Sequence, residues 1–455
     1  MHGFIPNRHG LPLTVETRSL RRMIERLSWI LYNLALTGLW PAIALYYGVR
    51  ARTDGKYRTS YHRRLGLELP EPTPKPGAIW IHALSVGETL SALPLLAALR
   101  HALPDRELVL SSATESGHRI AQAQAKRLTS QRFILAHDML WSMSALVKRI
   151  RPALFVLVET DLWPNLLWVL ERRRVPMVLV NGRISDRSLT RLRFLKPAAA
   201  WLPARFQLIF CQSRRDRERF LQIGADPARV FAVGNLKFDL VRAQAADCRV
   251  DELRGQLGLS PDRPVWIAGS THPGEEAALL DAHLGLRRRH PDLLLILAPR
   301  HPERGRQIAS FCQSRDLAWG LRSRGDRTTG TAVFILDTLG ELGSCYALAR
   351  AAFIGGSLVR FGGHNPLEAA VHGVPCCWGP HLSNFREIED TLLTNGCGRM
   401  AASGAAVADE IDRWLSAPEL SAAVGANCAR LFAAEGRAAA RIVATIRRGI
   451  RPNLC

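Results

Sequence analysis

The chain has 455 residues, a formal net charge of +21 and a hydrophobic content of 47%. That hydrophobic content excludes an intrinsically disordered chain. The length exceeds the size at which a single hydrophobic core stops growing, so two domains are expected. The excess of basic residues, most of which are arginine, predicts an anionic partner: a nucleic acid, an acidic membrane surface or a phosphorylated substrate. The nine cysteines are scattered without a C-x-x-C pair, which favours reduced thiols over disulfide bonds or a zinc site.

An apolar segment near the N-terminus predicts contact with a membrane, and residues 1–50 are interpreted as a membrane-anchor segment without a cleavable signal peptide. No charged residue occurs between Arg26 and Arg50, a run about long enough to cross a bilayer as a helix. Pro41, Asn33 and Thr37 weaken its apolar character, so a helix lying in the membrane interface is one alternative. A buried amphipathic helix of a soluble domain is another.

Basic residues flank this segment on both sides and suit anionic lipid head groups. They are Arg18, Arg21, Arg22 and Arg26 before the segment, and Arg50, Arg52, Lys56, Arg58, Arg63 and Arg64 after it. Because both flanks are basic, charge alone leaves the topology open.

From residue 78 onward, apolar runs of strand length alternate with segments of helix length, which is typical of a parallel sheet. The strands expected in the first half are 78–83, 107–111, 154–158, 175–180, 206–211 and 230–233. Those expected in the second half are 265–268, 293–298, 332–336, 351–354 and 374–378. The polar stretch 241–263 between the halves is interpreted as a linker, and the alanine-rich segment 403–448 is expected to be helical.

This alternation predicts an α/β fold of two Rossmann-like domains, the GT-B architecture of many nucleotide-sugar transferases, preceded by the membrane-associating helix. The expected N-terminal domain spans residues 51–245, and the expected C-terminal domain spans residues 246–425. A last helix within 426–455 is expected to pack back on the N-terminal domain, by analogy with such folds.

The segment Trp80–Glu88 places a carboxylate directly after a predicted strand. Its apolar run ends in a loop of small residues, and Glu88 stands where the next helix begins. Ligands of open α/β sheets bind beyond the carboxyl ends of the strands, so Glu88 is expected to face a substrate. The simpler interpretation is that Glu88 complements the dipole of the helix that it opens.

Further motifs follow this segment in a fixed order. They lie at residues 158–165, 234–239, 269–276, 299–304, 355–357 and 362–368. In this order and at this spacing, the motifs resemble those of the 3-deoxy-D-manno-octulosonic acid (Kdo) transferases of lipopolysaccharide biosynthesis. The resemblance extends from about residue 50 to about residue 393.

The resemblance implies an inverting glycosyltransferase that moves Kdo from CMP-Kdo to a lipid A precursor (lipid IVA) on the cytoplasmic side of the bacterial inner membrane. Lipid phosphates and an anionic membrane surface then account for the charge of +21 without nucleic acid. We expect no cofactor and no metal site, because no D-x-D follows a strand and the histidines lack ligand spacing. The oligomeric state, the number of Kdo units and the acyl pattern of the acceptor stay open.

The expected catalytic residues are Glu88, Glu159 and Lys237. Glu88 is interpreted as the general base that takes the proton of the acceptor hydroxyl, and its small neighbours Ser85 and Gly87 let a bulky glycolipid approach. The resemblance assigns Glu159 and Lys237 to support of the transition state. The alternative for Glu159 is a structural carboxylate that caps the following helix.

The donor is expected to bind in the second half. Arg300 suits a phosphate diester, with a surface arginine in a turn as the alternative. Glu368 is placed to accept both ribose hydroxyls, and the segment around Glu341 resembles the part of the family that contacts cytidine through its backbone. The expected binding residues are Ser270, Thr271, Pro299, Arg300, Gly340, Glu341, Leu342, Gly356, Ser357, Asn365, Pro366, Leu367 and Glu368.

Two glycine-containing motifs complete this expected site. Residues 355–357 end a strand and are expected to leave backbone N–H groups free for a ligand, and Asn365 is expected to cap the helix that Pro366 opens. Two other classes of protein remain as alternatives. A nucleotide-sugar 2-epimerase shares the two-domain shape but needs no apolar N-terminal segment. A nucleic-acid-binding protein would carry aromatic platforms or a reading module, and the sequence has neither.

Overall fold

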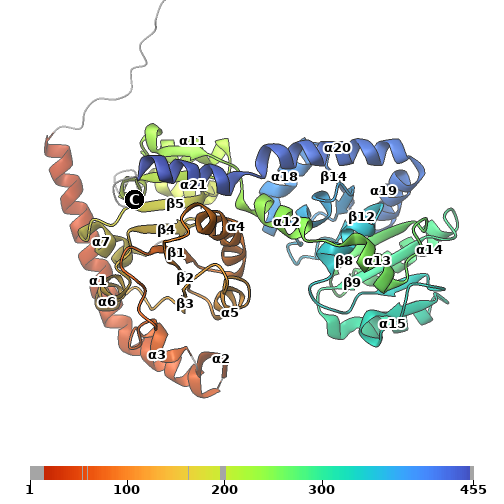
Figure 1. Cartoon of the computed structure of the whole chain (residues 1–455), viewed down its shortest axis with the longest axis horizontal. Helices are drawn as coiled ribbons and strands as arrows, with labels where there is room; N and C mark the ends of the chain where they lie inside the picture. The colour runs from red at the N-terminus through yellow and green to blue at the C-terminus, as the bar shows by residue number, and fades with distance from the viewer. Residues whose placement is uncertain (1–14, 54, 59, 162, 195–200, 451–455) are drawn as a thin grey trace, which may run out of the picture. The chain divides into compact units, whose positions relative to one another are not determined.

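The computed structural model describes residues 15–53, 55–58, 60–161, 163–194 and 201–450 (Figure 1). The chain forms two compact units, Met1–Lys237 with Arg437–Cys455, and Phe238–Gly436. The change from the first unit to the second falls within helix α12 (Leu236–Ala246), whereas the sequence analysis places the boundaries after residues 245 and 425. The stretch 241–263 is not an extended linker, because α12 and α13 (Val250–Leu257) occupy most of it.

The first unit is built on seven parallel strands in the order β3-β2-β1-β4-β5-β6-β7. The strands are β1 (Ile79–Ala83), β2 (Leu108–Ser112), β3 (Gln131–Ile134), β4 (Leu154–Val158), β5 (Met177–Gly182), β6 (Leu208–Cys211) and β7 (Val230–Ala232). The helices are α4 (Val86–Ala102), α5 (Glu115–Gln124), α6 (Leu140–Ile150), α7 (Pro164–Arg172), α8 (Asp186–Phe194), α10 (Trp201–Arg205) and α11 (Arg214–Gln222). Every residue of β1, β2, β4 and β5 is buried, as expected where helices cover both faces of a parallel sheet.

The second unit repeats this plan with the strand order β10-β11-β9-β8-β12-β13-β14. Its strands are β8 (Val265–Thr271), β9 (Leu294–Pro299), β10 (Trp319–Leu321), β11 (Val333–Ile335), β12 (Ala351–Ile354), β13 (Cys376–Trp378) and β14 (Gly398–Met400). Its helices include α14 (Glu276–Arg287), α15 (Gly305–Gln313), α16 (Leu342–Cys345), α17 (Leu367–Ala370), α18 (Arg386–Thr394), α19 (Gly404–Ser416) and α20 (Pro418–Glu435). All its paired strands are parallel, so its core also lies between buried sheet faces and helices.

Every strand predicted from the sequence is present, and the prediction of two doubly wound sheets is confirmed. Three strands were not predicted: β3, β10 and β14, each of which forms an edge of its sheet. An edge strand has a neighbour on one side only and need not be apolar along its whole length. Gln131–Arg132 in β3 and Arg399 in β14 break the apolar run that identified the central strands.

The last helix of the chain returns to the first unit. The predicted helical segment 403–448 forms α19, α20 and α21 (Ala438–Gly449). Ile442 and Ile446 of α21 are fully buried in the same core cluster as Leu95 and Leu99 of α4. Helix α21 thus covers one face of the first sheet together with α4.

The first helix, α1 (Val15–Thr53), runs beside α6 and α7 of the first unit (Figure 1). Its part Arg26–Thr53 is long and apolar enough to cross a membrane when judged by length and composition alone. The first fourteen residues of the predicted anchor segment lie outside the described part of the chain.

Candidate active site

In both units some of the predicted site residues stand at the topological switch point, where the strand order reverses, whereas Lys237, Arg300 and Gly340 follow other strands of the same sheets. The first sheet reverses between β1 and β4, which Glu88 and Glu159 follow directly. The second reverses between β8 and β12, at whose ends Ser270 and residues 355–357 lie. Loops diverge at such points and leave a crevice beyond the carboxyl ends of the strands. Parallel sheets therefore bring together residues that are far apart in the sequence.

Glu88 is buried in the loop between β1 and α4. Its Oε2 accepts from the backbone N–H of Leu84 at 2.6 Å, and its Oε1 accepts from the Ser85 hydroxyl at 3.2 Å. Ser85 is in turn the N-cap of α4 and accepts from the N–H of Glu88. This arrangement resembles a capping box, although the carboxylate accepts from the N–H of Leu84 and not from that of the N-cap residue Ser85, so the simpler interpretation of Glu88 as a residue that stabilises the helix start describes part of its role.

Burial and, after it, the negative charge of Glu159 together raise the pKa of Glu88 to about 7, while the hydrogen bonds from Leu84 and Ser85 oppose the shift. Asp161 adds a smaller charge effect in the same direction. A carboxylate with a pKa near the working pH can both take up and release a proton, as a general base requires. Gly87 beside it is exposed, and a side chain there would meet open space.

A polar network along the carboxyl edge of the first sheet connects Glu159 to the start of α12, which carries the half-buried Lys237. The amide of Asn181 donates to Glu159 Oε1 at 3.3 Å, and its oxygen accepts from the N–H of Leu236 at 3.1 Å. The N–H of Lys237 donates to the side chain of Asn235 at 3.0 Å. The structure thus brings two of the predicted catalytic residues into one connected network.

Asn181, Gln212 and Asn235 are network residues that the sequence analysis missed. Gln212 donates to the carbonyl of Asn181 and accepts from the amide of Asn235, so the three form a chain across β5, β6 and β7. Glu159 and Asn181 have positive φ angles of 61° and 55°, a conformation that non-glycine residues adopt rarely and often at functional sites. The sequence feature that could have identified these residues is a polar side chain at or just after the end of each of three successive strands.

A cleft of about 450 Å³ opens at the carboxyl end of the second sheet. Six of the predicted donor-binding residues line it: Ser270, Pro299, Arg300, Gly340, Leu342 and Glu368. Ser270 has a positive φ of 55° and lies at a register shift between β8 and β9. Such a bulge redirects one side chain out of the regular alternation of a strand, here towards the cleft.

The electrostatics of this cleft are set by Glu368 and Arg300. Burial raises the pKa of Glu368 to about 7, and the positive charge of Arg300 partly offsets that shift. Arg300 is exposed, and its backbone N–H is held by the carbonyl of Thr271 at 2.9 Å. In the part of the chain that the structure describes, the Arg300 guanidinium forms no hydrogen bond or ion pair. A cation and a titratable acid therefore face the same cleft.

The remaining predicted donor residues do not line this cleft: Thr271, Glu341, Gly356, Ser357, Asn365, Pro366 and Leu367. Thr271 is buried and donates to Glu276, while Glu341 forms an ion pair with Arg322 at 2.7 Å. Asn365 accepts from the N–H of Leu367 at 3.2 Å, but the N-cap position of α17 is Pro366, so Asn365 precedes the cap that the sequence analysis assigned to it.

The expectation that residues 355–357 leave backbone N–H groups free is wrong. The buried carboxylate of Glu275 accepts from the N–H groups of Gly356, Ser357 and Leu358 at 2.7–3.0 Å, and from that of His272 at 2.9 Å. The loop therefore binds an internal anion. Glu275, which is not among the predicted site residues, is the residue that shapes this loop.

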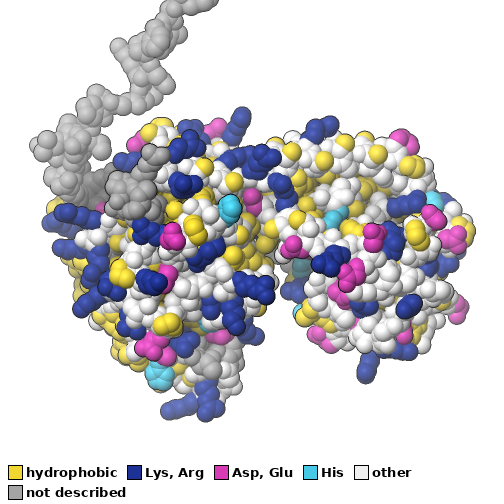
Figure 2. Space-filling view, in the orientation of Figure 1, with side chains coloured by type: hydrophobic (Ala, Val, Ile, Leu, Met, Phe, Trp, Pro, Cys, Tyr) yellow, Lys and Arg dark blue, Asp and Glu magenta, His cyan; other side chains and the backbone are white. Residues whose placement is uncertain are grey.

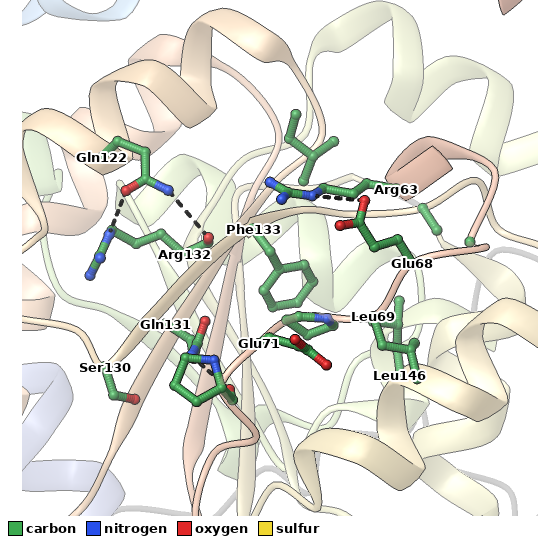
Figure 3. A pocket seen from close by; sticks show the side chains of 15 residues that line it. Arg63, Glu68, Leu69, Glu71, Gln122, Ser130, Gln131, Arg132, Phe133 and Leu146 are labelled. Atoms are coloured by element: carbon green, nitrogen blue, oxygen red, sulfur yellow. Dashed lines mark hydrogen bonds and ion pairs between the residues drawn. The ribbon is translucent and has the colours of Figure 1, made fainter. Parts of the chain in front are cut away.

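A second cleft, of about 360 Å³, lies in the first unit beside the edge strand β3. Figure 3 shows the Phe133 ring at its centre, with the Arg63–Glu68 ion pair on one side and Gln122 with Arg132 on the other. None of the predicted site residues lines it. It is therefore separate from the carboxyl ends of β1 and β4, where Glu88 and Glu159 stand.

Two Rossmann-like units in one chain define the GT-B class, and a solved structure shares this fold. The UDP-GlcNAc 2-epimerase of Neisseria meningitidis bound to UDP-GlcNAc superposes with a TM-score of 0.60 over 82% of this chain and 100% of that chain. Its sequence identity is 11%, so the likeness concerns the fold alone.

The family follows from sequence comparison. The model of the 3-deoxy-D-manno-octulosonic-acid transferases (kdotransferases) matches residues 59–240. The 3-deoxy-D-manno-octulosonic acid transferase of Haemophilus influenzae is 33% identical over 363 residues, which cover 80% of this chain and 84% of that protein. The transferase of the same name from Bordetella pertussis is 34% identical over 403 residues, covering 85% and 91%. The chain belongs to the Kdo transferase family, whose members are glycosyltransferases of lipopolysaccharide biosynthesis, and the resemblance noted in its motifs is confirmed.

The role of Glu275 predicts a large effect of a nearly isosteric change. Glu275→Gln should lower the free energy of unfolding by about 2–4 kcal/mol, because an amide NH2 group would face N–H donors that now share a carboxylate. Urea unfolding followed by circular dichroism measures the change. Glu303→Gln, at an exposed position in the same unit, is the matched control and should change stability little. Equal stability of the two variants would contradict this role of Glu275.

Proposed function

We propose that this chain transfers Kdo from CMP-Kdo to a lipid A precursor such as lipid IVA, with inversion at the anomeric carbon of Kdo and Glu88 as the general base. The observation that supports the proposal most is the cleft of the second unit, which combines Arg300, Glu368 and the Gly340 loop at the carboxyl edge of its sheet. Membership of the Kdo transferase family supplies the identity of the sugar.

In this proposal the cleft binds the nucleotide part of the donor. The Arg300 guanidinium pairs with the phosphate, for which its planar group of donors is suited. The ionised Glu368 accepts from the ribose hydroxyls, which is consistent with its position inside the same cleft. Gly340, with a φ of 90°, and Leu342 present backbone groups to the cytosine ring from the loop that opens α16. His372 supports that loop through its contact with the carbonyl of Gly343 at 3.0 Å.

The transfer step uses Glu88 in its ionised form. As the acceptor hydroxyl attacks the anomeric carbon of Kdo, its oxygen forms the new glycosidic bond and its proton passes to Glu88. The bond between that carbon and the phosphate oxygen breaks, and CMP leaves with the electron pair. Attack from the face opposite the leaving phosphate inverts the configuration.

Glu159 and Lys237 have supporting roles in the proposal. The negative charge of Glu159 keeps the pKa of Glu88 high, so that Glu88 is basic enough to take the proton. Kdo carries its own carboxylate, and Lys237 provides a positive charge at the same sheet edge. The network through Asn181 fixes the position of Glu159 relative to the start of α12, which carries Lys237.

The acceptor is a membrane lipid, and the proposed place of reaction is the cytoplasmic face of the bacterial inner membrane. Helix α1 supports this location because it supplies an apolar segment long enough to engage a bilayer. The net charge of +21 favours binding both to the lipid phosphates of the acceptor and to an anionic membrane surface.

The proposed function is tested by incubating the purified full chain with CMP-Kdo and a tetra-acylated, bis-phosphorylated lipid A precursor. We expect mass spectrometry of the lipid to show an increase of one or more Kdo masses, which also counts the units transferred. Glu88→Gln should abolish the increase, because an amide cannot take the proton. An unchanged lipid with folded wild-type protein and intact donor would contradict the proposed donor and acceptor.

The pKa of Glu88 predicts how the rate depends on pH. At saturating donor, kcat should rise about tenfold per pH unit below about pH 7 and then level off, because only the ionised carboxylate is a base. Glu159→Gln should move the midpoint to lower pH, since it removes a negative charge that raises the pKa of Glu88. Glu218→Gln, at an exposed position on α11, should leave the midpoint in place. A pH-independent rate between pH 5 and 8 would argue against Glu88 as the base.

Nucleotide affinity tests the cleft of the second unit. Arg300→Ala should weaken CMP binding by about tenfold or more, since a charge-assisted hydrogen bond to phosphate contributes about 1.5–3 kcal/mol. Glu368→Gln should weaken it as well and should remove the part of the pH dependence that arises from ionisation of Glu368 near pH 7. Arg306→Ala, an exposed arginine on α15, is the control. Unchanged affinity in both cleft variants, measured by calorimetry, would place the nucleotide elsewhere.

A further inference from the structure

Helix α1 has two faces with opposite surroundings. The half-buried residues recur every three or four positions: Trp29, Tyr32, Asn33, Leu36, Trp40, Ile43, Ala44, Tyr47, Gly48 and Ala51. The exposed large apolar residues fill positions between them: Met23, Leu27, Ile30, Leu31, Leu34, Leu39, Leu45, Tyr46 and Val49. Because this spacing matches the helical period, the first set forms one face, here called the inner face, and the second set forms the outer face.

The inner face is held to the first unit by polar contacts in the N-terminal half of the apolar segment. The Tyr32 hydroxyl donates to Asp138 at 3.0 Å. The side-chain amides of Asn33 and Asn165 donate to each other at 3.0 and 2.9 Å. Asp138 and Asn165 are buried, and Asp138 also accepts from the N–H groups of Asn165 and Leu166 at the start of α7. These side chains thus join α1 to the capped end of another helix.

Aromatic contacts extend this attachment along α1. They join Trp29 to Trp168 at 4.6 Å, Trp40 to Trp141 at 5.9 Å and Tyr47 to His137 at 4.9 Å between ring centroids. From Trp29 to Tyr47 the helix is about 27 Å long, close to the thickness of the hydrocarbon core of a bilayer. The helix therefore contacts the folded domain over nearly the whole length that a membrane span would need.

The outer face is apolar and open to solvent in the described part of the chain. Leu34 is 65% exposed and Leu45 is 69% exposed. Figure 2 shows hydrophobic and basic side chains together along the edge of the first unit that α1 forms. Large contiguous apolar patches are rare on proteins that meet only water.

Arginine side chains bracket the outer face. Arg26 is exposed at its N-terminal end, and Arg50 and Arg52 are exposed at its C-terminal end, with Arg58 on the short helix α2 (Gly55–Arg58) that follows. An apolar strip between two groups of arginine residues complements a bilayer that carries anionic lipids. An apolar protein partner would not require charge at both ends.

We propose that α1 lies flat in the membrane interface, with its outer face among the lipid head groups and upper acyl chains, and does not cross the bilayer. This inference deepens the proposed function, because it places the acceptor domain on the membrane surface that holds the lipid substrate. A spanning helix would carry its inner face and the attached Asp138 and Asn165 into hydrocarbon, or else break their contacts with α1. A flat helix keeps them and places both arginine groups at one membrane surface.

Vesicle binding tests the occupant of the outer face. The full chain should cosediment with vesicles of phosphatidylethanolamine and phosphatidylglycerol, and less with phosphatidylcholine alone. The double variant Leu34→Glu/Leu45→Glu should lower the vesicle partition coefficient by more than about tenfold. The control Leu393→Glu/Met400→Glu changes two exposed apolar residues of the second unit and should bind as the wild type does. Equal binding of both double variants would overturn the proposal.

Depth measurement separates a flat helix from a spanning one. Fluorophores are attached at Leu27→Cys or Leu45→Cys in a chain whose Cys248 and Cys455 are replaced by serine, since the other cysteines are buried. Quenching by lipids with nitroxides at known depths should place both labels at the same shallow level, about 5–10 Å into the interface. A difference in depth approaching about 27 Å, the separation of the two sites along the helix, would overturn the proposal.

The outcome is independent of the transfer assay, because neither measurement uses the donor. Failure of vesicle binding would leave the proposed activity to be judged by its own test, and absence of Kdo transfer would leave the docking result standing. Gel filtration without lipid tests whether a second copy of the chain covers the outer face instead of a membrane. If the wild type is a dimer and Leu34→Glu/Leu45→Glu is a monomer with unchanged vesicle binding, a second copy of the chain covers that face and the proposal is wrong.

Discussion

The parallel direction of the strands is the constraint on which the site depends. Parallel strands need crossover helices, so every carboxyl end in a sheet lies along one edge and every loop that follows a strand opens there. In the first unit this edge carries Glu88, Glu159 and the Asn181 network; in the second it carries the cleft with Arg300 and Glu368. The loops of Glu88 and Glu159 flank the point where the strand order of the first sheet reverses, and those of Ser270 and Gly356 flank the corresponding point of the second. The polarity of the sheets therefore assembles residues that are separated by long stretches of sequence.

Carboxylates perform different tasks in the two units because their surroundings differ. Glu88 and Glu368 share a pKa near 7 that arises from burial, but a second negative charge raises it in one case and an arginine lowers it in the other. Glu275 is buried against four backbone N–H groups and has become part of the loop architecture. The same functional group thus serves as a titratable acid where it meets a crevice and as a structural anion where backbone donors surround it.

The proposed flat position of α1 connects the fold to its substrate. A lipid acceptor stays in the membrane, so an enzyme that is attached along one helix avoids extracting the lipid into water. The polar contacts of Tyr32 and Asn33 fix which face of the helix is turned outward. The polar residues that weakened the segment as a membrane span are the ones that attach it to the domain. Their buried partners are on α7 and the loop before α6, so the orientation of the helix depends on the fold of the whole unit.

The sequence by itself determined the fold class, the central strands and the family, and it predicted the residues of the proposed site. Fully buried parallel strands need long apolar runs, and the motifs directly follow those runs. It did not reveal the edge strands β3, β10 and β14, because half-covered strands tolerate Gln131, Arg132 and Arg399. Only the tertiary structure decided which predicted residues share a cleft, that Glu275 occupies the N–H groups of the Gly356 loop, and that Asn181 and Ser270 are turned by bulges. The reason is physical: a side chain's hydrogen-bond partners, pKa and direction depend on neighbours brought together by packing, and local sequence carries no record of those neighbours.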